Sequence, residues 1–164
     1  MAYIRNRSEE LTGFQDSAPY RPVTDFATDF AMVYGTDDTM PRRVQEYREA
    51  GYVVHLMTGI AWGNYQDYLD GSFDGKTHWD EGQRDRDDAP INHGVMTPNE
   101  VPYMVPTESF VTYLIAKLKR AVDAGVEAVH MEEPEFWDEG GYSPAFQREY
   151  EAFYGEKWRP QHTD

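Results

Sequence analysis

Apolar residues in this sequence gather in short runs that alternate with longer segments of helical periodicity. Three runs have the length and composition of buried strands, and they cover residues 29–35, 52–60 and 126–133. Runs of this kind are bounded by residues that break a strand, and Gly35 and Gly51 stand at two of these limits. We therefore predict three buried strands over these ranges.

A helical pattern follows each predicted strand, over residues 41–50, 108–124 and 144–154. Thr107 and Ser143 precede two of these segments and are suited to cap them. The apolar face of the second helix consists of Phe110, Leu114, Leu118 and Ala121. The glycines expected to end the three helices are Gly51, Gly125 and Gly155.

Strands that alternate with helices indicate a parallel sheet, so we predict an α/β fold. Residues 1–27 are polar and are expected to form an irregular lead-in. The domain itself is expected over residues 28–158, with a short tail over 159–164. Inside the domain, residues 62–106 are rich in Asp, Gly, Asn and Pro, and a short strand or hairpin is expected near 101–105. A loop segment of this length is often functional.

The amino-acid composition limits the kinds of molecule that this protein is expected to bind. The net charge of −15 argues against nucleic acid and anionic membrane, because both need a positive protein surface. The absence of cysteine excludes disulfides and Cys-ligated zinc. No signal-like N-terminus or membrane-length apolar window is evident, and localisation stays open. The 4 Trp, 12 Tyr and 8 Phe predict either a Tyr-rich core or an aromatic ligand cleft.

A group of carboxylates marks the end of the third predicted strand. Glu132 and Glu133 stand where ligands bind in parallel α/β folds. Side chains alternate along a strand, so only one of the two is expected to enter a barrel interior. Pro134 is expected to hold the residue before it in an extended conformation. Phe136 and Trp137 follow, and a carboxyl beside an apolar wall can act as general acid in glycoside hydrolysis.

The sequence Glu132-Glu133-Pro134 resembles the Asn-Glu-Pro that ends the fourth strand of many clan A glycoside hydrolases. The resemblance implies that Glu133 is the general acid/base and that Glu132 replaces the Asn that holds the sugar 2-hydroxyl. Residues 141–158 are similar to the helix and Tyr-Gly…Trp tail that follow this strand in β-galactosidase-like barrels. The resemblance therefore implies the N-terminal part of a (β/α) TIM-type barrel and hydrolysis of O-glycosidic bonds.

In that family the catalytic nucleophile lies on the seventh strand, which would fall beyond Asp164. We therefore expect the chain to be a truncated barrel that lacks full activity, or one half of a barrel completed by a second copy or by further sequence. The predicted ligand is a carbohydrate, and no cofactor or metal is expected. The predicted substrate contacts, besides Glu132 and Glu133, are Trp62, Trp79, His130, Glu135 and Trp137.

Two alternatives remain open. The same aromatic and acidic residues are compatible with a carbohydrate-binding or interaction module that catalyses no reaction. His130 and Glu132 alternate on one strand face and resemble part of a divalent metal site, although a local histidine hydrogen bond is the simpler interpretation. The acidic loop at residues 67–75 offers oxygen ligands but lacks the spacing of an EF-hand, so we predict a solvated loop.

Overall fold

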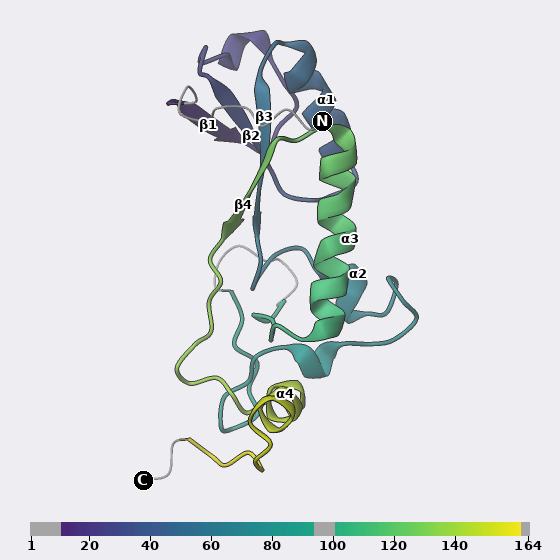
Figure 1. Ribbon diagram of the computed structural model, residues 1–164, viewed down its shortest axis with the longest axis vertical. Helices are drawn as coiled ribbons and strands as arrows, with labels where there is room; N and C mark the ends of the chain where they lie inside the picture. The colour runs from purple at the N-terminus through teal and green to yellow at the C-terminus, as the bar shows by residue number, and fades with distance from the viewer. Residues whose placement is uncertain (1–10, 94–100, 162–164) are drawn as a thin grey trace. The chain divides into compact units, whose positions relative to one another are not determined.

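The computed structural model describes residues 11–93 and 101–161 (Figure 1). Contacts within the chain divide it into two compact units. The first unit comprises residues up to Thr58 together with 116–132, and the second comprises 59–115 together with 133–164. Each unit has its own hydrophobic core, and they are described in turn.

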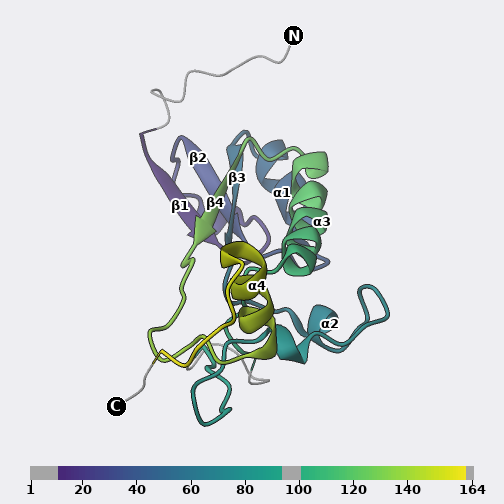
Figure 2. The same cartoon turned by 60° about the horizontal axis from the view of Figure 1, so that its bottom comes forward.

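A four-stranded parallel sheet organises the first unit. Its strands, drawn in Figure 2, are β1 (Gly13–Asp16), β2 (Phe30–Tyr34), β3 (Val53–Gly59) and β4 (Ala128–Glu132). Hydrogen bonding places them in the order β1-β2-β3-β4. Neighbours in the sheet are thus neighbours in sequence, as in a singly wound (β/α) sheet. The prediction of an α/β fold with a parallel sheet is confirmed, as are the three predicted strands.

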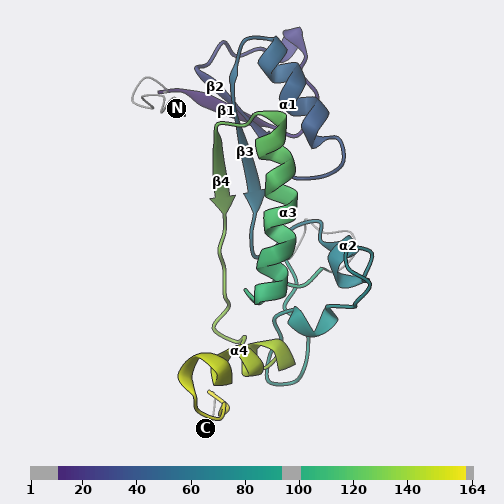
Figure 3. The same cartoon turned by 45° about the vertical axis from the view of Figure 1, so that its right-hand side comes forward.

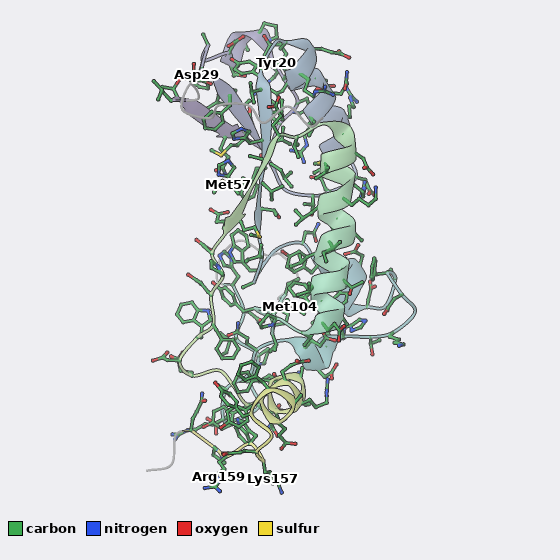
Figure 4. The ribbon with its side chains drawn as sticks, in the orientation of Figure 1. Tyr20, Asp29, Met57, Met104, Lys157 and Arg159 are labelled. Carbon is green, nitrogen blue, oxygen red and sulfur yellow. The ribbon has the colours of Figure 1, made fainter. Side chains whose placement is uncertain are left out.

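The prediction of an irregular lead-in over residues 1–27 is wrong for β1. This strand has only four residues and no run of apolar residues, so it gave no sequence signal. It forms because it pairs with β2, with Gly13 opposite Phe30. The starts of β1 and β2 are joined by the carboxylate of Asp29, which Figure 4 labels. This carboxylate accepts from the Thr12 backbone N–H at 2.8 Å and from the Thr12 hydroxyl at 2.8 Å.

Helices cover one face of this sheet. They are α1 (Met40–Glu49) and the C-terminal half of α3 (Glu108–Ala124), and Figure 3 shows both on the same side. The strand side chains that pack against these helices are every second residue, because successive side chains of a strand point to opposite faces of the sheet. Residues of this core include Ala31, Val33, Met40, Val44, Tyr47, Val54, Leu56 and Ala121. The strand residues that alternate with these core residues point to the other face of the sheet. They include Phe30, His55 and His130, whose rings lie together.

A buried arginine fixes the turn between β2 and α1. Arg43 is almost fully buried, and its guanidinium donates to the Tyr34 carbonyl at 2.8 Å and to the Asp37 carboxylate at 2.7 Å. The same carboxylate group accepts from the Thr39 backbone N–H at 2.7 Å. The donors lower the pKa of Asp37, although burial alone would raise it. The charge of Arg43 is therefore paired, as a buried cation must be.

The second unit has a core made largely of aromatic residues. Its short elements are α2 (Gln66–Leu69) and the 3-10 turn η3 (Trp79–Glu81), both inside the predicted loop, and it ends with α4 (Pro144–Tyr154). The expected strand near residues 101–105 is reduced to isolated antiparallel bridges. Buried residues of this core are Tyr65, Tyr68, Leu69, Val101, Met104, Phe110 and Tyr113.

The predicted helix limits are confirmed by their caps. The Thr107 hydroxyl accepts from the Phe110 backbone N–H at 3.0 Å, and the Ser143 hydroxyl accepts from that of Phe146 at 3.3 Å. Gly155 ends α4 in the left-handed conformation, with φ of 67°. Within residues 11–93 and 101–161, no helix combines the length and apolar character that crossing a membrane requires.

Candidate functional site

Glu133 has an unusual backbone. It directly follows β4, and its φ of 48° lies in the left-handed region. The prediction that Pro134 holds this residue extended is therefore wrong. A tight turn replaces the extended chain, since the Glu135 backbone N–H donates to the Glu133 carbonyl at 2.8 Å. A non-glycine residue in this conformation costs about 1–3 kcal/mol, and such residues cluster at functional sites.

Four rings of the second unit form what we call the aromatic row. The Trp62 ring stacks on the His93 ring with centroids 4.0 Å apart, and His93 meets Tyr103 edge-on at 5.5 Å. Tyr103 meets Trp137 edge-on at 5.6 Å. Trp62 is only 6% exposed, whereas Trp137 is 40% exposed, so the row runs from a buried indole to an accessible one. Two of the predicted sugar contacts, Trp62 and Trp137, thus belong to one set of rings.

Two of the predicted carboxylates border the aromatic row. A Glu133 carboxylate oxygen lies 3.8 Å from His93 Nε2, which is an electrostatic contact but too long for a hydrogen bond. The Glu133 side chain is 42% exposed. Burial, followed by a hydrogen bond to Glu135, raises the pKa of Tyr103 to about 12. The two carboxylates therefore lie beside the middle rings of the row, His93 and Tyr103.

A buried amide fixes the loop that carries these groups. Gln83 is fully buried, and its side-chain nitrogen donates to the Glu135 carbonyl at 2.9 Å and to the Met104 carbonyl at 3.3 Å. Its side-chain oxygen accepts from the Trp137 backbone N–H at 3.0 Å. Figure 4 labels Met104. Because Gln83 uses both ends of its amide, it connects the loop after β4 to the segment that carries Tyr103.

A buried carboxylate organises the rest of the second unit. Glu81 accepts from the hydroxyls of Tyr68 at 2.6 Å, Ser109 at 2.6 Å and Thr107, and from His78 Nδ1 at 2.9 Å. Burial alone would raise the pKa of Glu81, but the donors outweigh it and the pKa is lowered. We call this set the Glu81 network. It connects α2, η3 and the start of α3, and the sequence pattern gave no sign of it.

His78 lies between two carboxylates. Its Nδ1 faces Glu81 at 2.9 Å and its Nε2 faces Asp74 at 3.1 Å, and its ring stacks on Tyr68 with centroids 3.9 Å apart. A carboxylate only accepts, so both contacts are hydrogen bonds when the imidazole carries two protons. Burial would lower the pKa of His78, but Glu81 and Asp74 outweigh it and raise the pKa.

The stability of the second unit is therefore expected to be greatest in mildly acidic solution. The Glu81 contribution is present above the ordinary carboxyl pKa of 4.5 and is lost as the pH falls through the lowered value. The His78 contribution is complete below 6.5 and is lost as the pH rises through the raised value. Denaturant unfolding across this range should show both declines. Replacing His78 with Gln should remove the alkaline decline alone, and an unchanged alkaline decline would contradict this assignment.

The acidic loop at residues 67–75 uses its carboxylates internally. Asp67 accepts from the Tyr113 hydroxyl at 2.6 Å, and Asp70 accepts from the Ser72 backbone N–H at 2.9 Å. Asp74 binds His78, as described above. Within the described ranges, no group of three His, Asp or Glu side chains is arranged to hold a metal ion. These carboxylates stabilise the loop conformation.

The remaining predicted site residues fall in different places. His130 belongs to the first unit, where its Nε2 lies 3.0 Å from Nδ1 of the buried His55, so the histidine has a local partner. Glu132, also in the first unit, accepts from the Tyr34 hydroxyl at 2.8 Å. Trp79 lies in η3 of the second unit, and no described ring contact joins it to the aromatic row. Its role as a sugar contact stays a prediction.

Comparisons with protein-family models, with curated proteins and with solved structures gave no match for this chain. The resemblance to clan A glycoside hydrolases consequently stays a prediction. Glu133 and the aromatic row are the features of the second unit that bear on function.

Proposed function

We propose that this chain carries the acid/base part of a (β/α)-barrel O-glycoside hydrolase, with Glu133 as general acid/base. One observation supports this most strongly. With β1 included, β4 is the fourth strand of a sequentially ordered parallel sheet, and Glu133 directly follows it. The acid/base of clan A enzymes has this position, and the left-handed backbone of Glu133 is typical of a functional residue.

The aromatic row would supply the sugar-binding surface. Flat apolar rings with polar edges suit a sugar ring, which has apolar C–H faces and hydroxyl edges. In the proposed reaction Glu133 protonates the glycosidic oxygen of the leaving group and later removes a proton from water. Glu132 belongs to the first unit, where its carboxylate accepts from the Tyr34 hydroxyl, and its role as an orienting residue stays a prediction from the resemblance.

Hydrolysis also needs a second carboxylate. The resembling enzymes place it on a seventh strand, and the described residues of this chain form four strands in one sheet. We therefore assign to this chain the acid/base and the sugar-binding rings. Four further strands, from a second copy of the chain or from additional sequence, would complete the barrel.

Glu133→Gln tests the catalytic assignment. The variant removes the transferable proton but keeps the size of the side chain, so cleavage of an unactivated glycoside should fall by about 10²- to 10⁴-fold while sugar binding persists. The assay compares wild type and variant within a completed barrel, which supplies the second carboxylate, on a panel of neutral alkyl glycosides. Glu139→Gln, which changes an exposed carboxylate six residues along, is the control and should retain the wild-type rate. Equal rates for both variants would overturn the assignment.

A carbohydrate-binding module without catalysis is the second candidate. The observation that favours it is the 42% exposure of the Glu133 side chain beside the polar His93. General acids usually lie against an apolar wall that raises their pKa. Sugar binding that survives Glu133→Gln, together with no cleavage of any glycoside by the completed wild-type barrel, would favour this candidate over the hydrolase.

A further inference from the structure

Two histidines on neighbouring strands contact each other on the face of the sheet opposite α1. Nδ1 of His55 on β3 lies 3.0 Å from Nε2 of His130 on β4. Their rings are stacked with centroids 5.1 Å apart, and the Phe30 ring stacks on that of His55 at 4.4 Å. His55 is only 4% exposed, whereas His130 is exposed to solvent. The pair therefore joins a buried imidazole to one that solvent protons can reach.

A hydrogen bond between two imidazoles tolerates one added proton but not two. A neutral imidazole has one nitrogen that donates and one that accepts, so the bond persists while either ring is neutral. When both rings are protonated, two donors face each other at 3.0 Å and two positive charges repel. We infer that the His55–His130 pair is an acid-sensitive switch, which holds β4 against β3 at neutral pH and weakens this pairing when both rings are protonated.

Burial decides the order in which the two protons bind. The exposed His130 takes up the first proton and then donates to His55. The second proton has to bind His55, which is stacked on Phe30 and shielded from water. Burial disfavours the charged form of an imidazole, and the charge on His130 opposes a second one. The two rings consequently titrate as a coupled pair, and the second proton binds in more acidic solution than an exposed histidine requires.

Two other titratable groups share this face of the sheet. Glu132 lies two positions after His130 on β4, and its carboxylate accepts from the hydroxyl of Tyr34 on β2 at 2.8 Å. The negative charge of Glu132 favours the first proton on His130, but it does not replace the acceptor that a protonated His55 takes away. The other described strand residues of this face are uncharged: Gly13 and Gln15 on β1, Phe30 and Met32 on β2, Val53 and Met57 on β3, and Ala128 on β4.

The histidine contact lies in the half of β4 that leads to Glu133. At the start of the strand, the Glu127 backbone N–H donates to the Val54 carbonyl at 2.9 Å. The contact between His55 and His130 comes three residues later. Its loss therefore weakens the pairing of the C-terminal half of β4. Because Glu133 directly follows this strand, its backbone loses part of its anchorage in acid.

The two units are expected to respond to acid in opposite directions. The His55–His130 contribution is complete in neutral solution and is lost as the pH falls, because the unfolded chain then binds more protons than the folded pair. The pKa of His78 in the second unit is raised, so its contribution is complete below 6.5 and is lost as the pH rises. Mild acid should thus weaken the first unit and stabilise the second. The inference does not depend on the proposed function, since no sugar or reaction enters it.

Backbone hydrogen exchange of the full chain tests this switch. Exchange is followed by mass spectrometry at about pH 7 and about pH 5 and corrected for the intrinsic rate at each pH. Protection of the β4 amides should fall about tenfold in wild type, because a difference of one bound proton changes an equilibrium by up to about tenfold per pH unit. His130→Gln keeps a polar side chain beside His55 that cannot be charged, so its β4 protection should change by less than about twofold. His78→Gln is the matched control in the second unit and should show the wild-type fall in β4.

Each outcome bears on the switch directly. Equal β4 protection at the two pH values in wild type overturns it. So does an equally large fall in His130→Gln, which would assign the acid response to carboxylates. The ring ¹⁵N signals of wild type supply a readout that needs no variant to fold, and one of the two rings should still be neutral at about pH 5. Two protonated rings in protein whose β4 is as protected as at neutral pH would contradict the inference.

Discussion

Replacing Glu81 with Ala is expected to lower the free energy of unfolding of the second unit by about 3–5 kcal/mol, as measured for broken buried ion pairs. The substitution removes the one acceptor shared by Tyr68, Thr107 and Ser109. It also leaves His78 buried with one of its two carboxylate partners gone. Loss of this size is comparable to the whole stability of many small domains.

The neighbouring residue supplies a matched control. Asp80 pairs with Arg148 at 2.8 Å, but both side chains are largely open to solvent. Such an exposed pair contributes about 0–1 kcal/mol, so Asp80→Ala should be nearly neutral. Urea unfolding followed by tryptophan fluorescence measures both variants. If Glu81→Ala cost no more than Asp80→Ala, the Glu81 network would not be the stabilising centre of this unit.

Gln83→Leu is expected to have the second-largest effect. Leucine is similar in size to glutamine but carries no polar group. The Trp137 backbone N–H and the Glu135 carbonyl therefore lose their buried hydrogen-bond partner. We expect a loss of about 1–3 kcal/mol in stability, since the loop can recover part of its hydrogen bonding from water. The loop after β4 should loosen as a result, and sugar affinity should fall.

Two readouts distinguish loosening of this loop from general destabilisation. Trp137 emission should shift to longer wavelength in folded Gln83→Leu protein, because its ring leaves the contact with Tyr103. Gln147→Leu is the control, since the Gln147 amide on α4 donates to the Tyr142 carbonyl at 2.8 Å and contacts neither Trp137 nor Glu135 in any described hydrogen bond. If the two leucine variants gave the same emission and the same sugar affinity, Gln83 would have no special part in positioning the loop.

Local patterns predicted the regular elements well. The strand β2 is a continuous apolar run, β3 and β4 are mainly apolar runs interrupted by a histidine, and α3 and α4 begin at a hydroxyl cap. β1 was missed because its residues have neither length nor an apolar pattern, and only pairing with β2 makes it a strand. Its omission also changed the strand count, and with β1 included β4 becomes the fourth strand in sequence.

The candidate site was predicted only in part, because its contacts join residues distant in sequence. Trp62, Glu133 and Trp137 stood out by residue type and by position near strand ends. His93 and Tyr103, which connect them, lie in a segment without periodicity. Gln83 gave no signal, since a glutamine in a polar loop is indistinguishable from a solvated one until its partners 21 and 54 residues away are known.

In the proposed function, Glu133 acts on a sugar bound at the aromatic row. The most direct test is a crystal structure of Glu133→Gln with a neutral oligosaccharide bound. A glycosidic oxygen is expected within about 2.6–3.2 Å of the side chain at position 133, with a sugar ring beside Trp137. An oligosaccharide bound elsewhere, or a side chain at position 133 that points away from the bound sugar, would contradict it.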